Sequence, residues 1–500
     1  MTYISRRRFV LGGLGAVTGM TVLAACGQQT PAAPAPAKPA ESKPAAPAAA
    51  KPAETAAKPA AQAPAAASSK ENVTLRFLTT ESDPPSQKVY DAAVAEFTKA
   101  NPNIKVEMEY IGFDARTEKV VTGIGAKRAP QITQLVAYEV LEYGRLGFLS
   151  VVDDLLAETG GREKWQNGSL DGVTIDGKAY ALPYNGGSYR TLWYRSDLVK
   201  QPPKNWDEYK AVAKEFTKDT NNDGAMDMFG SSLPGGKNRW TMSNYMKFLW
   251  QTGETVFDKD FNVIFGKEGA VQAMQFYKDM IAFGPPGYAN YSYTETIDAF
   301  VSGKAATQPY AGRTLGTVYT NAKDLLDKVH GAKIPSGPIG GDVGSCSWDM
   351  YAIFNEKVGV SPAEQAAAKQ FLKHILTGKT ATDFALTVPG HLIPPHLDTL
   401  KDPNLWNGHD LMKSHKPEIE WLFNTENSLD LITEAGATIT AEKVTAGNVN
   451  PFWPAIDTSM VIPTMVQKVI VQNEAPKSAV EWGAGEMKRL VDQAKAKMKR

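Results

Sequence analysis

Polar and hydrophobic residues alternate in several short segments of the chain, and segments with helical spacing separate them. A period of two, which is typical of strands, occurs at residues 73–79 and 104–110, and residues 131–137 are predicted to form a third strand. Between and after these strands, helical spacing is found at residues 86–100, 117–127 and 138–144. We expect Pro84 and Pro85 to end the first strand and Ser86 to cap the first helix. This order predicts right-handed βαβ units and a mainly parallel sheet.

Further along the chain the apolar segments become shorter. Asp176-Gly177 between two of them predicts a hairpin. Asn205 before Trp206-Asp207-Glu208 predicts a helix start, because Asn is a favourable N-cap and acidic residues stabilise the first turn. We expect further strands at 179–184, 191–195 and 348–354, and further helices at 270–281, 296–301, 362–376 and 480–499. The fold class is therefore α/β, with mixed sheets flanked by helices.

The N-terminal segment has the pattern of an export signal. Arg6, Arg7 and Arg8 precede a short apolar run, and paired arginines are typical of the twin-arginine route. Leu23-Ala24-Ala25-Cys26 resembles a bacterial lipobox, which predicts cleavage before Cys26 and its acylation, for example with palmitate. Residues 1–26 are thus a predicted lipoprotein signal. The alternatives are the general export route, and an anchor helix around an ordinary cysteine.

Residues 27–70 consist almost wholly of Ala, Pro and Lys. They contain no aromatic and no branched aliphatic residue, so they cannot bury enough apolar surface to offset the entropy of folding. Repeated Ala-Pro and Lys-Pro steps favour an extended tether, which could reach on the order of 100 Å. The folded part is expected from Glu71 onward, and its length suggests two domains or one two-lobed body.

The charge balance argues against nucleic acid as a partner. The chain has 54 basic and 54 acidic residues, and the basic ones form no dense patch. Its two cysteines are Cys26 and Cys346, so acylation of Cys26 would leave no pair for an internal disulfide. After the signal, no apolar run reaches the length of a membrane span. We expect a monomer that is held by lipid on the extracytoplasmic side of the membrane.

Several segments, in this order and spacing, resemble the family 1 extracellular solute-binding proteins of ATP-binding-cassette (ABC) importers. They are Phe97–Val106, Asp176–Tyr184, Leu192–Leu198, Asn205–Tyr209, Phe276–Met280, Phe300–Ala306 and Gly390–Pro395. The chain departs from the family at Ala129-Pro130-Gln131-Ile132, where Pro-Asp-Val is usual, and at residues 308–313, where Gly-x-Trp is usual. No named sugar can therefore be carried over from a relative.

The resemblance implies a two-lobed periplasmic-binding-protein fold of the type II kind, with discontinuous lobes joined by hinge crossings. It implies one lobe at residues 71–182 and 339–379 and the other at 183–338 and 380–500. The crossings are expected near residues 182–183, 334–339 and 377–382. Such a protein binds a solute between its lobes, and lobe closure is what the membrane permease recognises.

Candidate ligand-binding residues follow the predicted strands, because ligands of open α/β sheets lie beyond the carboxyl ends of strands. Aromatic faces pack on the C–H side of a sugar ring, and polar side chains satisfy its hydroxyl groups. Each candidate could instead belong to the core. The candidates are Thr80, Glu81, Tyr138, Glu139, Tyr184, Asn185, Trp240, Tyr310, Arg313, Trp348 and Asp349.

One segment has the oxygen spacing of a calcium loop. Candidate ligands at positions 1, 3, 5, 7 and 9 are Asp219, Asn221, Asp223, Ala225 and Asp227, with Gly224 at the tight turn. The twelfth position is Gly230, which lacks the usual bidentate carboxylate. The alternative is a turn held by Asx hydrogen bonds. No cofactor is required by this sequence.

The sequence gives only weak signals of catalysis. It has neither a Gly-x-Ser-x-Gly elbow nor a His-Glu-x-x-His helix, and His391 and His396 read as turn residues. Our hypothesis is therefore a non-enzymatic receptor for a carbohydrate-like solute. The alternatives are a binding protein for a phosphopolyol or a peptide, and a lipoprotein that senses or scaffolds without transport.

Overall fold

The computed structural model describes residues 72–498, except for 426–427, 430–436, 442–443 and 446–448. The described residues all belong to one compact unit, Ser69–Arg500. The predicted signal, its Cys26 and the predicted tether lie outside them. Among the described residues, no helix combines the length and apolarity that crossing a membrane would need.

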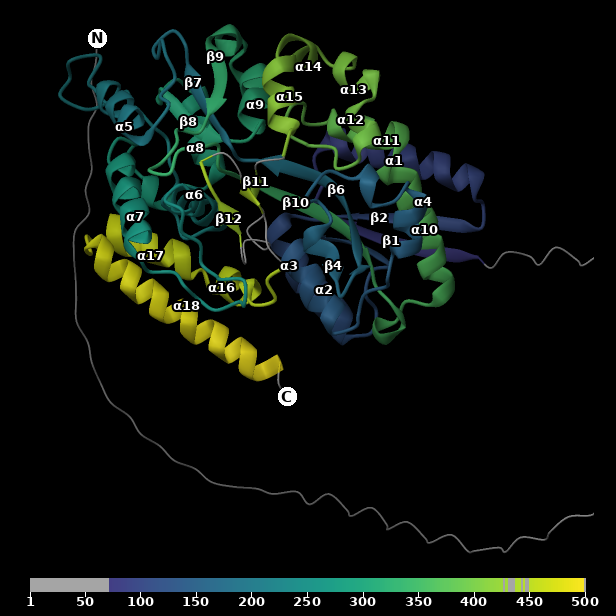
Figure 1. Cartoon of the computed structure of the whole chain (residues 1–500). Coiled ribbons are helices and arrows are strands. Elements are labelled where there is room, and N and C mark those ends of the chain that lie inside the picture. Colours follow the sequence, from purple (N-terminus) through teal and green to yellow (C-terminus); the bar gives the residue numbers. More distant parts are fainter. Residues whose placement is uncertain (1–71, 426–427, 430–436, 442–443, 446–448, 499–500) are drawn as a thin grey trace, which may run out of the picture. The chain divides into compact units, whose positions relative to one another are not determined.

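A six-stranded sheet organises the first group of elements, with strands drawn from residues 73–188 and 344–429 (Figure 1). Its strand order is β11-β10-β3-β1-β2, and β6 also pairs with β10, on the edge opposite β3. β1 is parallel to β2 and β3, as the alternation of strands and helices predicted, whereas β10 is antiparallel to β3 and β6. The strands are β1 (Val73–Thr79), β2 (Ile104–Tyr110), β3 (Ile132–Val136), β6 (Ala181–Ser188), β10 (Gly344–Ile353) and β11 (Ser428–Leu429).

Helices cover this sheet because their apolar residues recur on one face. Phe97 of α1 and Phe371 of α10 pack edge to face at a ring distance of 5.1 Å, and α10 packs on β1. The first helix starts three residues earlier than predicted: Asp83, not Ser86, is its N-cap, and Pro84 and Pro85 lie in its first turn. The helices are α1 (Pro84–Ala100), α2 (Phe113–Gly125), α3 (Ala137–Arg145), α4 (Asp153–Glu158), α10 (Pro362–Leu376) and α11 (Gly378–Ala385).

A three-stranded antiparallel sheet organises the second group of elements. β7 (Thr191–Arg195) lies between β8 (Thr307–Tyr310) and β9 (Val329–Lys333). Among its helices, α6 packs on α7 and α17, and α7 and α17 both pack on α18. The helices are α5 (Trp206–Glu215), α6 (Arg239–Trp250), α7 (Glu268–Ile281), α8 (Tyr293–Val301), α9 (Arg313–Asn321), α16 (Trp453–Ser459), α17 (Val461–Ile470) and α18 (Pro476–Met498).

Local signals in the sequence are confirmed at two further places. The Asp176-Gly177 hairpin joins β4 (Thr174–Ile175) to β5 (Lys178–Ala179), and the Asn205 side chain caps α5 by accepting from the backbone amide of Glu208. The remaining elements are α12 (Leu397–Leu400), α13 (Pro403–Asn407), α14 (Asp410–Ser414), α15 (Lys416–Phe423), β12 (Thr438–Ile439) and β13 (Val444–Thr445).

Two of the expected crossings fall within regular elements. Residues 182–183 lie inside β6, which pairs with β10 along the six-stranded sheet. Residues 378–382 belong to α11, which packs on α1 and α10. The lobe boundaries themselves stay a prediction.

Candidate functional site

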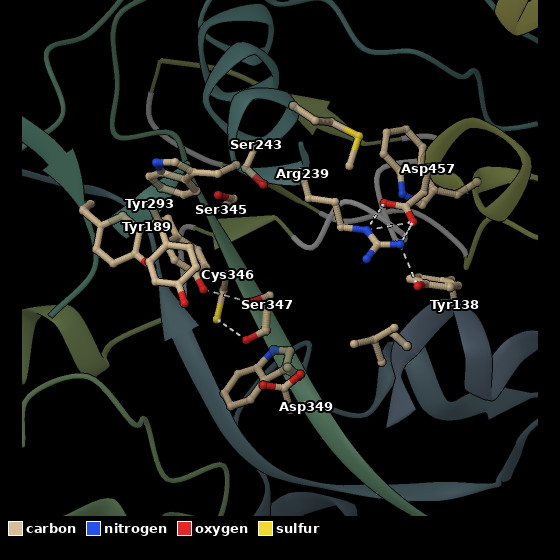
Figure 2. A pocket seen from close by; sticks show the side chains of 17 residues that line it. Tyr138, Tyr189, Arg239, Ser243, Tyr293, Ser345, Cys346, Ser347, Asp349 and Asp457 are labelled. Atoms are coloured by element: carbon tan, nitrogen blue, oxygen red, sulfur yellow. Dashed lines mark hydrogen bonds and ion pairs between the residues drawn. The ribbon is translucent and has the colours of Figure 1, made fainter. Parts of the chain in front are cut away.

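A cavity of about 320 Å³ lies between elements of the two sheets, and we call it the inner cavity. One side is formed by the start of α3 and by residues 345–349 of β10, and the other by the first turn of α6 with the end of β8 and the start of α8. Figure 2 shows the side chains of these elements converging from different parts of the chain. The Asn238 side chain caps α6 by accepting from the amide of Thr241, which fixes the first turn that carries Arg239 and Trp240.

Aromatic rings form one wall of the inner cavity. The rings of Trp240 and Tyr310 meet edge to face with centroids 4.6 Å apart, and the Tyr189 ring lies 5.2 Å from Trp240. Tyr293 stacks on Tyr310 at 6.1 Å. On the opposite side, Trp348 packs against Gly186, where an added Cβ would lie 2.6 Å from the indole ring. Glycine at position 186 therefore allows β6 to approach this ring closely.

Two buried polar atoms, one on each side of the cavity, have no hydrogen-bond partner among the described residues. They are Nε1 of Trp240, a residue that is 7% exposed, and Oγ of Ser345, a residue that is 3% exposed. Both residues line the inner cavity. A buried polar atom left unpaired costs about 1–3 kcal/mol. Neither atom is open to the cavity space, so a ligand would pair with them only after a neighbouring side chain moves.

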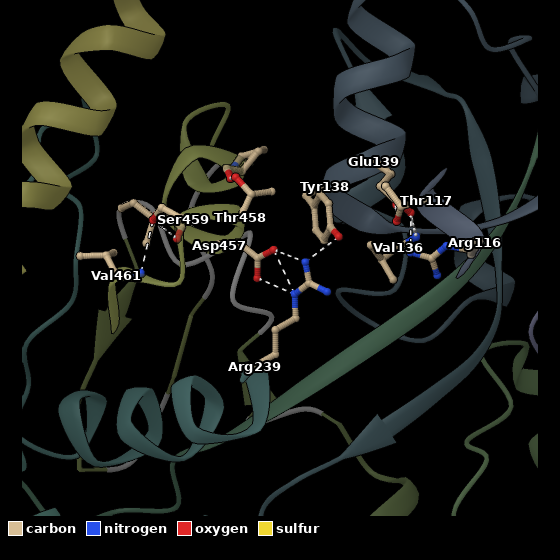
Figure 3. Close-up of polar contacts among 12 residues, drawn as sticks. Arg116, Thr117, Val136, Tyr138, Glu139, Arg239, Asp457, Thr458, Ser459 and Val461 are labelled. Carbon is tan, nitrogen blue, oxygen red and sulfur yellow. Dashed lines mark hydrogen bonds and ion pairs between the residues drawn. The ribbon is translucent and has the colours of Figure 1, made fainter. Parts of the chain in front are cut away.

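Arg239 bridges the two sides of the cavity. Its Nη2 donates to Asp457 Oδ2 at 2.7 Å and to the Tyr138 hydroxyl at 2.6 Å, and its Nε donates to both Asp457 oxygens (Figure 3). The guanidinium also lies 4.9 Å from the centre of the Tyr138 ring. Its Nη1 has no hydrogen-bond partner in the described part of the chain and is available to a ligand.

Asp349 is the acidic residue of β10 in the cavity wall. Burial raises the pKa of its carboxyl group to about 6, and the Arg116 guanidinium and the Asn185 side chain oppose the shift. Near neutral pH this group is therefore poised between a hydrogen-bond acceptor and a hydrogen-bond donor.

Glu81 lies behind this wall, in a network of tyrosines. Tyr184 donates to Glu81 Oε1 at 2.5 Å and stacks on Tyr351 at a ring distance of 4.0 Å. Burial raises the pKa of Glu81 to about 7, although the hydrogen bond from Tyr184 lowers it and Asp349 raises it further. A carboxyl group with this pKa is partly protonated at neutral pH.

Lys247 of α6 is fully buried on the other side of the cavity. Its Nζ donates to the backbone oxygen of Tyr189 at 3.2 Å and lies 4.9 Å from the centre of the Trp240 ring. No carboxylate pairs with this amine among the described residues. Burial lowers the pKa of Lys247 to about 7, so the amine directly behind the aromatic wall loses much of its charge.

The cavity brings together five of the eleven candidate residues: Tyr138, Trp240, Tyr310, Trp348 and Asp349. The other six lie outside its lining. Glu139 forms a buried ion pair with Arg116 at 2.8 Å and accepts from the amide of Val136 at the start of α3. Thr80 donates to Gln134, and Asn185 pairs with Asp349 along the sheet. Glu81 and Tyr184 form the network described above, and Arg313 begins α9.

Other lining residues escaped the sequence analysis. Tyr189 directly follows β6 and Arg239 precedes Trp240, so the position after a strand and the helix start could have indicated them. Asp457 lies on α16, more than two hundred residues from Arg239, so no local sequence pattern could predict this ion pair.

The predicted calcium loop is held by turn hydrogen bonds. The Asp219 carboxylate accepts from the backbone amides of Asn221, Asn222 and Gly224, and Asp223 accepts from the amide of Ala225. Asp227 accepts from Thr220 instead. No group of three or more His, Cys, Asp or Glu side chains in the described ranges could hold a metal ion. This geometry favours the Asx-turn alternative.

Comparison with known proteins places the chain in a family. Residues 81–381 match the bacterial extracellular solute-binding proteins, and the chain belongs to this family. It is 24% identical over 357 residues to "Putative ABC transporter periplasmic-binding protein YcjN" of Escherichia coli K12, covering 69% of this chain and 78% of that protein. A protein of Brucella abortus named "Putative binding protein BAB2_0491" is 26% identical and matches over 55% of this chain and 66% of its own length.

Solved structures share the two-lobed fold. The maltose-bound MalE3 of T. maritima matches with a TM-score of 0.68 at 21% identity, covering 84% of this chain and all of that one. A solute-binding protein of Agrobacterium radiobacter in complex with ribitol matches with a TM-score of 0.67 at 18% identity, covering 84% of this chain and 99% of that one. UgpB of Mycobacterium tuberculosis in complex with glycerophosphocholine has a TM-score of 0.66 at 14% identity, covering 84% of this chain and 99% of that one.

The chain is thus a solute-binding protein of an ABC transporter and not an enzyme. Proteins of this class bind small molecules and deliver them to the permease components of the transporter.

Proposed function

We propose that this protein captures an uncharged carbohydrate-like solute, a sugar or a polyol, in the inner cavity. The observation that carries the proposal is an aromatic wall that faces polar side-chain atoms of Ser345, Ser347 and Asp349 on β10. A sugar presents C–H faces to aromatic rings and hydroxyl groups to such atoms. It would satisfy both the apolar and the polar part of this lining.

The charge state of the residues around the inner cavity supports an uncharged ligand. The cation in the lining, Arg239, is already paired with Asp457, so it carries little net charge into the cavity. The carboxyl of Asp349 and the amine of Lys247 are both shifted by burial toward their neutral forms. A phosphorylated ligand would need an unpaired cation to offset the loss of its hydration.

The proposal is tested with a thermal-shift screen followed by calorimetric titration. The panel contains neutral mono- and oligosaccharides, the polyols ribitol and mannitol, glycerophosphocholine and short peptides. We expect a raised melting temperature with one or more neutral sugars or polyols, because a ligand that binds only the native state stabilises it. Stabilisation only by glycerophosphocholine or only by peptides would overturn the proposal in favour of the corresponding alternative.

The two lobes are proposed to close around this solute. The proposed boundaries are residues 71–182 and 339–379 for one lobe, and 183–338 and 380–500 for the other. The Arg239–Tyr138 hydrogen bond supports closure, because it joins the start of α6 to α3 of the other group of elements. Solution scattering with and without the sugar identified above should show a smaller radius of gyration in the bound state.

Export and anchoring are part of the proposal. Cleavage before Cys26 and its acylation would hold the protein as a monomer on the extracytoplasmic face of the membrane, with residues 27–70 as the tether. Labelling of cells with a palmitate analogue should mark the wild-type protein, and Cys26→Ala should lose both the label and the membrane fraction. Replacing Arg6 and Arg7 with Lys should block export if the twin-arginine route is used.

A further inference from the structure

A second cavity of about 420 Å³ adjoins the inner cavity, and we call it the outer cavity. It lies among α2, α3 and the end of α16. Tyr138 and Arg239 line both cavities. The two spaces are therefore separated at this point by side chains.

The partition is formed by the Arg239 bridge. In Figure 3 the guanidinium lies between Asp457 on one side and Tyr138 on the other, with Glu139 and Arg116 beyond Tyr138. The Arg239 side chain is 37% exposed, and it has more rotatable bonds than any other group in the wall. Its Nη2 makes the hydrogen bond to Tyr138 that closes the partition, at 2.6 Å. A rotation of this one side chain, or a ligand that passes beside it, would join the cavities.

The outer cavity repeats the chemistry of the inner one. Tyr138 and Tyr143 supply ring faces, and Thr117, Thr458 and Glu142 supply hydroxyl and carboxyl groups. Burial and the nearby Glu139 raise the pKa of Glu142, which moves this carboxyl toward its neutral form as well. Each cavity has a volume within the range that accommodates a small ligand.

We propose that the outer cavity is a second ligand subsite, so that the solute is an extended carbohydrate of at least two sugar units with Arg239 at the junction. This inference rests on the function proposed above. The first unit packs on the Trp240 wall, the second lies between α2, α3 and α16, and Arg239 contacts the linkage region through its unpaired Nη1.

The test compares disaccharides with the monosaccharides from which they are built. Maltose, cellobiose, lactose and xylobiose are titrated calorimetrically against glucose, galactose and xylose. We expect at least one disaccharide to bind 10-fold or more tightly than its own monosaccharide. If a monosaccharide binds as tightly as every disaccharide that contains it, the subsite is overturned while the proposed function stands. If none of the seven sugars binds but a polyol or another neutral sugar of the screen does, the subsite is overturned while the proposed function stands. If no neutral sugar or polyol binds, both are overturned.

A substitution in the outer cavity tests whether the preference for disaccharides depends on this cavity. Thr458 is exposed at the end of α16, and its hydroxyl donates to the backbone oxygen four residues earlier. Thr458→Trp should fill the outer cavity, lower the affinity for the best disaccharide to that of its monosaccharide, and leave the monosaccharide affinity unchanged. Equal weakening of both sugars, or of neither, would contradict the subsite.

Thr320 offers a matched control. It is exposed in the last turn of α9, makes the same hydrogen bond to a residue four positions earlier, and lines neither cavity. Thr320→Trp should change neither affinity. Val121→Trp, at a residue of α2 that is 54% exposed and lines the outer cavity, provides a second variant from the opposite wall. It should reproduce the selective loss of disaccharide binding even if Thr458→Trp folds poorly.

Discussion

Two sides of the inner cavity bury opposite kinds of ionisable group. The side formed by the six-stranded sheet holds carboxyl groups, Asp349 in the wall and Glu81 behind it, within a network of tyrosine hydroxyls. The side formed by α6 holds an aromatic wall with an amine, Lys247, behind it. Burial raises the pKa of the carboxyl groups and lowers the pKa of the amine. The ionisable groups on both sides are therefore shifted toward their neutral forms.

The difference between the sides lies in how each group is satisfied. Glu81 has a hydroxyl donor at 2.5 Å, whereas Lys247 has one backbone oxygen and the face of a ring. The sheet side can therefore exchange hydrogen bonds with ligand hydroxyls, and the α6 side offers mainly apolar contact. An uncharged solute with one apolar face and several hydroxyl groups is complementary to this arrangement.

The largest expected effect is on stability, from removing the buried amine. The pKa of Lys247 is lower in the folded state than in the unfolded state, so the unfolded state binds more protons between about pH 7 and 10 and stability rises with pH there. Lys247→Met keeps the chain length without the charge and should stabilise the protein at pH 7 by on the order of 4 kcal/mol. Thermal melts from pH 6 to 10 should show a flatter profile than the wild type.

Lys214→Met, at an exposed position of α5, is the control for this variant. It should leave both the melting temperature and its pH profile unchanged. A lower melting temperature for Lys247→Met at every pH would contradict the α6 side of the comparison.

The next largest effect is on affinity, from removing the aromatic wall. Trp240→Ala should weaken binding of the sugar identified in the screen about 100-fold, as expected for a buried aromatic anchor. Trp240→Phe, which keeps a ring and removes Nε1, should cost about 10-fold. Trp482→Ala on α18 lies outside the cavity lining and should leave affinity unchanged. An unchanged affinity in Trp240→Ala would place the ligand elsewhere.

A smaller effect on stability is expected from Glu81. Because the pKa of its carboxyl is higher in the folded state, the folded state binds more protons between about pH 4.5 and 7, and this contribution to stability is lost as pH rises. Glu81→Gln should remove that pH dependence, which is worth about 2 kcal/mol. Glu96→Gln, at an exposed position of α1, should retain it. Chemical unfolding at pH 4.5, 5.5 and 7 measures both variants.

The smallest effect concerns the pH dependence of binding. If the Asp349 carboxylate accepts hydrogen bonds from the solute, affinity should fall as pH is lowered through about 6. Asp349→Asn should weaken binding about 10-fold at pH 8 and make it independent of pH between 5 and 8. Asp298→Asn, at an exposed position of α8, should behave as the wild type. Affinity that is constant for the wild type over this range would show that the carboxylate is no acceptor.

Local signals predicted the fold well where neighbouring residues decide the structure. Alternation predicted β1 and β2, and Asn205 predicted the start of α5, because period and capping act over a few residues. Pro84 and Pro85 were misread because proline suits the first turn of a helix as well as a break before it. The antiparallel pairing of β10 with β3 joins segments about two hundred residues apart, which periodicity cannot indicate.

The residues of the site were predictable only where a local position in the sequence indicates them. Tyr138 and Trp240 lie in the first turns of α3 and α6, where the position after a strand and the helix start indicated them. Trp348 was expected at the start of a strand, yet it lines the cavity from within β10, which begins four residues earlier. Glu139 also lies in the first turn of α3, yet its carboxylate caps α3 and pairs with Arg116. Which of two plausible side chains faces the cavity depends on long-range packing.

Calorimetric titration with one sugar in neutral and charged forms tests the central claim most directly. The neutral sugar that gives the largest thermal shift is compared with its phosphate ester and its uronic acid at pH 7.5. An uncharged binding site predicts measurable heat with the neutral sugar and at least 100-fold weaker binding of both charged forms. Tighter binding of the phosphate ester than of the neutral sugar would contradict the account.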